Sequence, residues 1–178
     1  MDMIRRILAK TPSGFQEELK RYYFRLQIKK GRFNTSEPEF GKLGSFVKAD
    51  DWVIDIGANI GHYTNRLSDL VGPNGRVIAF EPIPTTFAHL SDNLQYSKHN
   101  NITLINVAAS DRVVLVGMSV PSFSSGLKNY YQASISSEDD ETEISILTLP
   151  IDNLDLNHKI QLVKIDAEGH EPAVFKGM

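Results

Sequence analysis

Three carboxyl groups of this sequence stand within or directly after short apolar runs. They are Asp55, Glu81 and Asp166, and each run is four or five residues long. The carboxyl ends of parallel strands form one edge of a sheet, and ligands of open α/β sheets bind there. Carboxyl groups at such an edge can hold hydroxyl groups or cations and can take up protons. The sequence therefore predicts one acidic ligand site built from several strand ends.

A turn of small residues separates the first run from a helical pattern. Gly57 and Gly61 bound this turn, and small residues let the chain reverse tightly while a ligand approaches its backbone. Free N–H groups at the new helix's start point at such a ligand. Glu81 fits the position about 20 residues further on, where an acid holds ribose hydroxyls. A βαβ unit that binds an adenosine-type ligand is therefore expected.

The turn differs from the dinucleotide pattern Gly-x-Gly-x-x-Gly/Ala. Aligned on Gly57, Asn59 takes the second position and His62 the third. A pyrophosphate needs close backbone approach at the second position, so a nicotinamide-dependent oxidoreductase is disfavoured. The turn also lacks the Lys-Ser/Thr ending of a P-loop. Asp55 suits a ligand with positive charge, such as a sulfonium with an α-amino group, which points to S-adenosylmethionine.

Three blocks of sequence carry a resemblance to a known family. They are DIGANIGHYT at 55–64, FEP at 80–82 and KIDAEGHE at 164–171. In this order they resemble the FkbM-type family of S-adenosylmethionine-dependent methyltransferases, over roughly residues 40–178. The resemblance implies a Rossmann-like, doubly wound, mostly parallel α/β sheet of the class I methyltransferase type, with S-adenosyl-L-methionine as cofactor. It does not identify the methyl acceptor.

The predicted cofactor site combines the first turn with the other strand ends. By resemblance, Asp111 after the third strand accepts a hydrogen bond from the adenine amino group, although Asp also commonly opens turns. The candidate cofactor-binding residues are Asp55, Gly57, Asn59, Gly61, Glu81 and Asp111.

The loop after the fourth predicted strand holds the candidate catalytic residues Asp166, Glu168 and His170. Strands one and four are neighbours at the switch point of such a sheet, so this loop is expected to face the methyl group. Methyl transfer to a hydroxyl requires alignment and removal of a proton. His170 is the first candidate base and His62 its rival, although the family often has a small residue in place of His170. Asp166 and Glu168 could instead cap the helix, and a metal ion on them with Glu171 is not expected.

Composition excludes several functional classes. The 178 residues suffice for one core domain, and a formal net charge of -3 gives no electrostatic reason to expect nucleic acid or an anionic membrane as partner. The absence of cysteine excludes disulfides and fits the cytoplasm. No apolar run approaches the roughly 20 residues of a membrane span, and no signal peptide is recognised.

Two regions are expected, a helical preface at 1–44 and the cofactor-binding domain at 45–178. The preface is expected to pack as a helix with a solvated basic face, rather than to form a lid, and Phe40 could line the cofactor site. Its apolar stripe contains Phe15, Leu19, Tyr22, Tyr23 and Leu26.

Strands are predicted at about 52–56, 76–81, 102–107 and 162–165, with helices after the first two. Residues 112–149 predict a β-hairpin inserted before strand four, in which Tyr130 and Tyr131 could meet a substrate. The acids at 138–141 are expected to form a solvated loop rather than a metal site.

The chain ends in the helix after strand four, whereas the resemblance implies further C-terminal strands. An exposed strand-four edge is therefore expected, through which a homo-oligomer could form. The cofactor pocket is expected to survive while catalysis is impaired. Two functions compete: O-methylation of a hydroxyl on a small molecule or glycan, and a non-catalytic adenosine-ligand-binding or assembly module.

Overall fold

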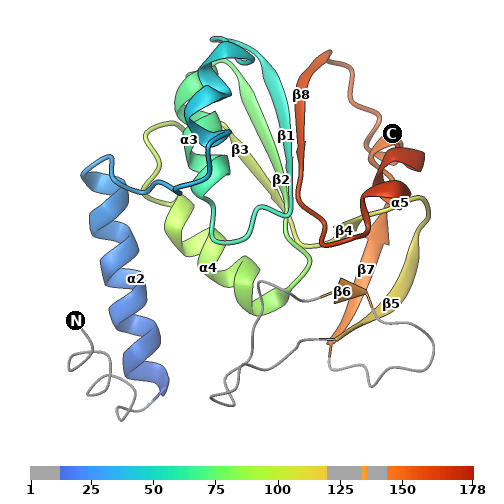
Figure 1. The fold of residues 1–178 in the computed structure, drawn as a ribbon, viewed down its shortest axis with the longest axis horizontal. Helices are drawn as coiled ribbons and strands as arrows, with labels where there is room; N and C mark the ends of the chain where they lie inside the picture. Colours follow the sequence, from blue (N-terminus) through green and yellow to red (C-terminus); the bar gives the residue numbers. More distant parts are fainter. Residues whose placement is uncertain (1–12, 120–133, 136–143) are drawn as a thin grey trace.

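The computed structural model describes residues 13–119, 134–135 and 144–178 (Figure 1). Its strands form two sheets, one in the order β3-β2-β1-β8 and one in the order β4-β7-β5-β6. The elements are α2 (Ser13–Lys29), η1 (Phe40–Ser45), β1 (Trp52–Ile56), α3 (His62–Val71), β2 (Arg76–Phe80), α4 (Pro84–Leu94), β3 (Ile102–Ile105), β4 (Ala108–Ala109), β5 (Val114–Ser119), β6 (Ser134–Ile135), β7 (Ile144–Leu149), η3 (Ile151–Leu154), β8 (Ile160–Ile165) and α5 (Glu171–Lys176).

The first sheet is parallel throughout and confirms the predicted fold class. Its central strand β1 is buried on both faces, because Val53 packs with Leu67 on the α3 side while Ile54 packs with Val174 on the α5 side. In Figure 1, α3 and α4 lie to the left of these strands and α5 to the right. Strands covered on both faces read as continuous apolar runs, which is why the sequence pattern located β1 and β2 well.

The second sheet confirms the predicted hairpin insertion. Strand β5 pairs antiparallel with β7, while the short β4 pairs parallel with β7 and joins the hairpin to the end of β3. One face of this sheet packs toward the first sheet, because Met118 and Ile146 form a cluster with Ile83 and Ala108. The hairpin therefore stands beside the carboxyl ends of the parallel strands. Tyr130, Tyr131 and the acids at 138–141 lie outside the described residues.

Helix α2 confirms the predicted helix but not the predicted contact face. Three members of the expected stripe are exposed, namely Leu19, Tyr22 and Tyr23. The basic face instead contacts α4: Arg21 Nε lies 2.9 Å from Asp92 Oδ2, and the Arg25 guanidinium lies 4.6 Å from the centre of the Tyr96 ring. At exposed positions such a cation–aromatic contact contributes roughly 0.5–1 kcal/mol. The basic side chains of α2 remain exposed despite these contacts, and Ile28 rather than the expected stripe supplies the buried apolar contact.

Strand β8 lies at one edge of the parallel sheet, with β1 as its pairing partner among the described residues. This agrees with the predicted position of strand four, and a homo-oligomer through that edge stays a prediction. Within the ranges that the structure describes, no helix is both long and apolar enough to cross a membrane.

Candidate functional site

A cavity opens at the carboxyl ends of β1, β2 and β8, beside the inner face of the hairpin sheet. Six predicted site residues line it: Gly57, Asn59, Glu81, Asp166, Glu168 and His170. The wall also contains Ile56, Phe80, Pro82, Ile83, Thr86, Val107, Ala108, Ala109, Met118 and Ala167. The structure thus brings together the ends of the strands that the sequence predicted to meet. The other three predicted residues, Asp55, Gly61 and Asp111, are not part of this lining.

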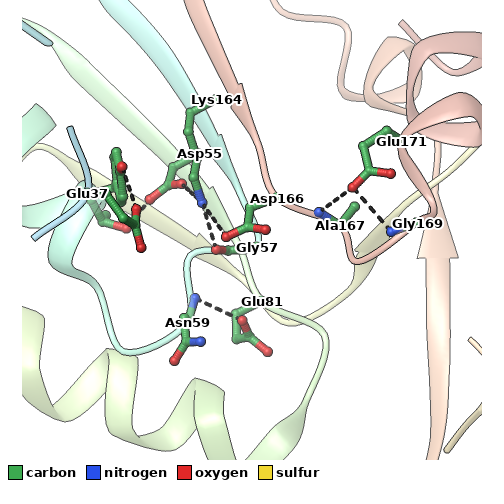
Figure 2. A network of polar contacts seen from close by, with 12 residues as sticks. Glu37, Asp55, Gly57, Asn59, Glu81, Lys164, Asp166, Ala167, Gly169 and Glu171 are labelled. Atoms are coloured by element: carbon green, nitrogen blue, oxygen red, sulfur yellow. Dashed lines mark hydrogen bonds and ion pairs between the residues drawn. The ribbon is translucent and has the colours of Figure 1, made fainter. Parts of the chain in front are cut away.

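Glu81 is the buried acid of the cavity, with only 4% of its surface exposed. Its Oε2 accepts a hydrogen bond from the backbone N–H of Asn59 at 2.9 Å, as Figure 2 shows, and its Oε1 accepts one from the N–H of Ile83 at 3.0 Å. Burial raises the pKa of Glu81 to about 7, because the lost hydration outweighs these two hydrogen bonds. The loop therefore holds the carboxyl group in one place, in a form that ionises near neutral pH.

Asp55 does not reach the cavity. It is fully buried on the α3 side of β1, where its Oδ2 accepts a hydrogen bond from Thr64 Oγ1 at 2.6 Å. Its Oδ1 has no hydrogen-bond partner within the described residues and lies 3.5 Å from Lys164 Nζ. Successive side chains of a strand point to opposite faces, so a residue inside β1 faces a helix rather than the strand end. Lys164 is the cation beside the Asp55 carboxyl group in this structure, and a contact of Asp55 with a cationic ligand group stays a prediction.

Lys164 is a residue that the sequence analysis did not single out. Its Nζ donates to the carbonyl oxygen of Gly57 at 3.1 Å and lies 3.5 Å from Asp166 Oδ2 (Figure 2). It also lies 4.9 Å from the centre of the Tyr63 ring. Asp55 and Lys164 are register partners in neighbouring parallel strands, so their side chains share one face. A lone cation in an apolar strand, opposite a lone acid in its neighbour, was the signal available in the sequence.

The two glycines of the first turn are explained by protein contacts. Gly57 has a φ of 71°, and an added Cβ would lie 1.9 Å from the carbonyl oxygen of Asp166. Gly61 has a φ of 100°, and its Cβ would lie 2.9 Å from Leu90 of α4. Both positions therefore favour glycine because of conformation and close packing. The expectation that a ligand imposes these small residues is not needed to explain either of them.

Glu171 holds the loop between β8 and α5. Its Oε1 accepts hydrogen bonds from the N–H groups of Ala167 at 3.1 Å and Gly169 at 3.3 Å (Figure 2). Hydrogen bonds from backbone N–H groups, its own first, lower the pKa of Glu171. Glu171, rather than Asp166 or Glu168, therefore closes the turn before α5, and the N-cap position of that helix has no side-chain capping hydrogen bond. Within the described residues, no group of three or more acidic or histidine side chains is placed to hold a metal ion.

The two candidate bases lie in different surroundings. His170 lines the cavity, and its Nε2 lies 2.9 Å from the Oγ of Ser110, a residue that the sequence analysis did not consider as functional. His62 instead packs on Phe33, with ring centres 4.2 Å apart, and burial lowers the pKa of His62. His62 is not among the lining residues, so His170 is the one of these two histidines that lies at the cavity, and its role as base stays a prediction.

Two further predicted contacts lie away from the cavity lining. Phe40 packs edge-on against Tyr63, with ring centres 5.2 Å apart, in the core between η1 and α3. Asp111 is exposed and lies 3.5 Å from Arg112 Nε. Neither residue lines the cavity, and the adenine contact of Asp111 stays a prediction.

The cavity has the chemical character that an adenosine-type cofactor requires. Apolar side chains, including Ile83 before α4, Val107 before β4 and Met118 on β5, provide walls for a flat base. The carboxyl group of Glu81 and the loop backbone provide hydrogen-bonding groups for hydroxyls. These residues fit S-adenosylmethionine.

The family described as "Methyltransferase FkbM domain" matches residues 55–178. Solved structures also match in part, among them Aeropyrum pernix fibrillarin in complex with S-adenosyl-L-methionine, at 28% identity over 36% of this chain and 27% of that chain, with a TM-score of 0.34. A precorrin-6y C5,15-methyltransferase from Geobacter metallireducens matches at 29% identity over 41% and 40% of the two chains, with a TM-score of 0.36. No curated protein matches the chain.

A methyltransferase from Aquifex aeolicus, described as SAM-dependent, matches at 21% identity over 49% of each chain, with a TM-score of 0.38. Each of these matches spans less than half of the other protein's length. At such TM-scores the matches carry no argument about function, so the assignment depends on the family and on the cavity.

Proposed function

Because the chain belongs to the FkbM methyltransferase domain family, we propose that its cavity binds S-adenosylmethionine and that it methylates a hydroxyl group of a small molecule or glycan. The observation that carries this proposal is Glu81, a buried acid at the end of β2 whose oxygens are fixed by backbone N–H groups at the cavity wall. An acid at this position of a βαβ unit is the one that binds ribose hydroxyls.

Different residues of the cavity bind the cofactor and accept the proton. The side chains of Ile83, Val107 and Met118 enclose the base, and Glu81 accepts hydrogen bonds from the ribose. When bound, the cofactor supplies a methyl group on a sulfonium, and its transfer forms an O–C bond, breaks an S–C bond and leaves S-adenosylhomocysteine. His170 takes the proton that the acceptor hydroxyl loses.

We further propose the cytoplasm as the compartment, which the absence of cysteine supports.

Transfer of a labelled methyl group from S-adenosylmethionine to a panel of hydroxylated acceptors tests this function. His170→Gln is the informative variant, and His62→Gln is its matched control because His62 packs on Phe33 instead of lining the cavity. Loss of a general base costs roughly 10²–10⁴-fold in rate, so His170→Gln should lose activity by at least the lower value while His62→Gln keeps most of it. Equal activity of the two variants would contradict the role of His170.

Absence of transfer to any acceptor, with cofactor binding intact, would favour the competing function of a non-catalytic binding or assembly module. The proposal of an enzyme would then fail, while the proposed cofactor site would stand.

A further inference from the structure

Ser110 links His170 to a second acidic residue. It follows β4 directly and is buried, with 4% of its surface exposed. Its Oγ lies 2.9 Å from His170 Nε2 and 3.4 Å from Asp111 Oδ1. A serine hydroxyl carries one hydrogen and can also accept. The three side chains can therefore form one directed chain of hydrogen bonds.

The direction of that chain follows from the carboxylate. An ionised Asp accepts hydrogen bonds and donates none, so the Ser110 hydroxyl donates to Asp111 Oδ1 and its oxygen is left to accept from His170. The hydrogen on the neutral imidazole must then sit on Nε2. The other ring nitrogen, Nδ1, makes no hydrogen bond within the described part of the chain and is left as an acceptor.

We propose that Ser110 and Asp111 are positioning residues that hold His170 as the Nε2–H tautomer and so make Nδ1 the proton acceptor in the cavity. The use of Nδ1 as a base rests on the proposed methyl transfer to a hydroxyl. The tautomer itself does not, because it depends only on contacts within this chain. This assigns Asp111, which the resemblance related to adenine, to orientation of the base.

The backbone around Ser110 is held firmly enough for this task. Its N–H donates to the carbonyl oxygen of Leu149 at 3.1 Å, which ties Ser110 to the end of β7. An added Cβ on Gly177 would lie 2.0 Å from the carbonyl oxygen of Ser110, so the end of α5 packs directly on this backbone. His170 stands at the start of the same short helix. The two partners are therefore fixed relative to each other through α5.

The arrangement differs from that of a serine nucleophile. In a catalytic triad the acid contacts the second nitrogen of the imidazole and thereby orients it toward the serine. Here Asp111 contacts Ser110 itself, and Ser110 is not among the cavity-lining residues. Ser110 therefore acts through His170 rather than on a substrate.

Long-range ¹H–¹⁵N NMR of the imidazole groups, at a pH where they are neutral, measures the tautomer directly. His170→Gln identifies the His170 signals by their loss, and wild-type protein should show Nε2–H as the main form of His170. Ser110→Ala should shift the ratio about fivefold toward the Nδ1–H form, since a typical net hydrogen bond has that effect on an equilibrium. Ser110→Thr keeps the hydroxyl and should restore the wild-type ratio, and Asp111→Ala should cause a smaller shift because its contact is longer.

The His62 signals serve as the internal control, because His62 packs on Phe33, far along the chain from these changes, and should not respond. A main Nδ1–H form of His170 in the wild-type protein would overturn the proposal, even if Ser110→Ala failed to fold. So would an unchanged ratio in folded Ser110→Ala. Failure of methyl transfer with the expected tautomer present would reject the proposed function and leave the hydrogen-bond chain in place.

Discussion

Asp55 and Glu81 are two buried acids on neighbouring strands, and their surroundings differ completely. Asp55 lies inside β1, where its carboxyl group accepts a hydrogen bond from Thr64 and forms an ion pair with Lys164. Glu81 lies one residue beyond the end of β2. Its carboxyl group accepts hydrogen bonds from backbone N–H groups and lines the cavity. The first acid connects two strands and a helix of the protein to one another, whereas the second faces the cavity. Position relative to the strand end, rather than residue type or burial, separates the acid of the interior from the acid at the cavity.

The largest expected effect is on stability, from removing the charge of Asp55. Asp55→Asn should destabilise the protein by about 3 kcal/mol, because the largely buried ammonium group of Lys164 loses its buried partner and, within the described residues, keeps only the exposed carboxyl group of Asp166 as an ion pair. Urea unfolding measures this, with the fluorescence of the single tryptophan, Trp52, as the probe. Asp69→Asn on the exposed side of α3 is the matched control and should change the free energy of unfolding by less than about 0.5 kcal/mol. A similar stability of the two variants would show that Asp55 is not the structural acid described here.

A double substitution measures the interaction between Asp55 and Lys164 directly, and its expected effect is somewhat smaller. Lys164→Met should also destabilise, but Asp55→Asn combined with Lys164→Met should lose less than the two single losses added together. Coupling of about 1–3 kcal/mol is expected for groups in one network. The same unfolding measurement on all four proteins gives the coupling energy. Strict additivity would mean that the two side chains do not act on each other, despite their shared face and register.

The smallest expected effect is the pH dependence that Glu81 imposes on ligand binding. Its pKa is raised from 4.5 to about 7 in the folded protein, so at pH 6 most molecules carry the protonated form and at pH 8 most carry the carboxylate. If the carboxylate binds ribose hydroxyls, affinity for S-adenosylhomocysteine should rise about tenfold between those pH values, following the competent fraction. Calorimetry at the two pH values checks this. Glu81→Gln should lose the dependence, and a wild-type affinity that falls with pH would contradict it.

The same pKa has a consequence of opposite sign for stability. Because the folded-state pKa lies above the unfolded value, the contribution of Glu81 to stability is complete below about pH 4.5 and is lost as the pH rises through 7. The free energy of unfolding of wild-type protein, compared with Glu81→Gln, should therefore fall between pH 5 and pH 8. Ligand affinity and stability should thus respond to the ionisation of Glu81 in opposite directions.

Much of the fold could be predicted because the parallel strands are continuous apolar runs and the helices between them have regular apolar periodicity. The bounds of β1 were predicted without error, and helices follow β1 and β2 as predicted. The exposure of Leu19, Tyr22 and Tyr23 on α2, which the sequence pattern did not predict, has a different origin. Its contact partners, Asp92 and Tyr96, lie far along the sequence, so no local pattern could indicate that cations rather than apolar side chains face α4.

For the site, too, local sequence patterns predicted some residues and could not predict contacts between distant segments. The acids at strand ends were found because a single rule of the fold places them together. The roles of Lys164 and Ser110 depend on which strands are neighbours and in what register, and that is tertiary information. Asp55 is an exception, because strand alternation alone indicates that it faces a different side from Ile54 and Ile56.

The central claim is that the cavity beside Glu81 binds S-adenosylmethionine, and one calorimetric experiment tests it most directly. Wild-type protein, Glu81→Gln and Asp69→Asn are titrated with S-adenosylhomocysteine at pH 8, with NAD as the control ligand. The expected result is binding of S-adenosylhomocysteine but not of NAD, weakened about tenfold or more in Glu81→Gln because a hydrogen bond to a charged group is lost, and unchanged in Asp69→Asn. Binding that Glu81→Gln leaves intact, or no binding by a folded wild-type chain, would contradict the claim.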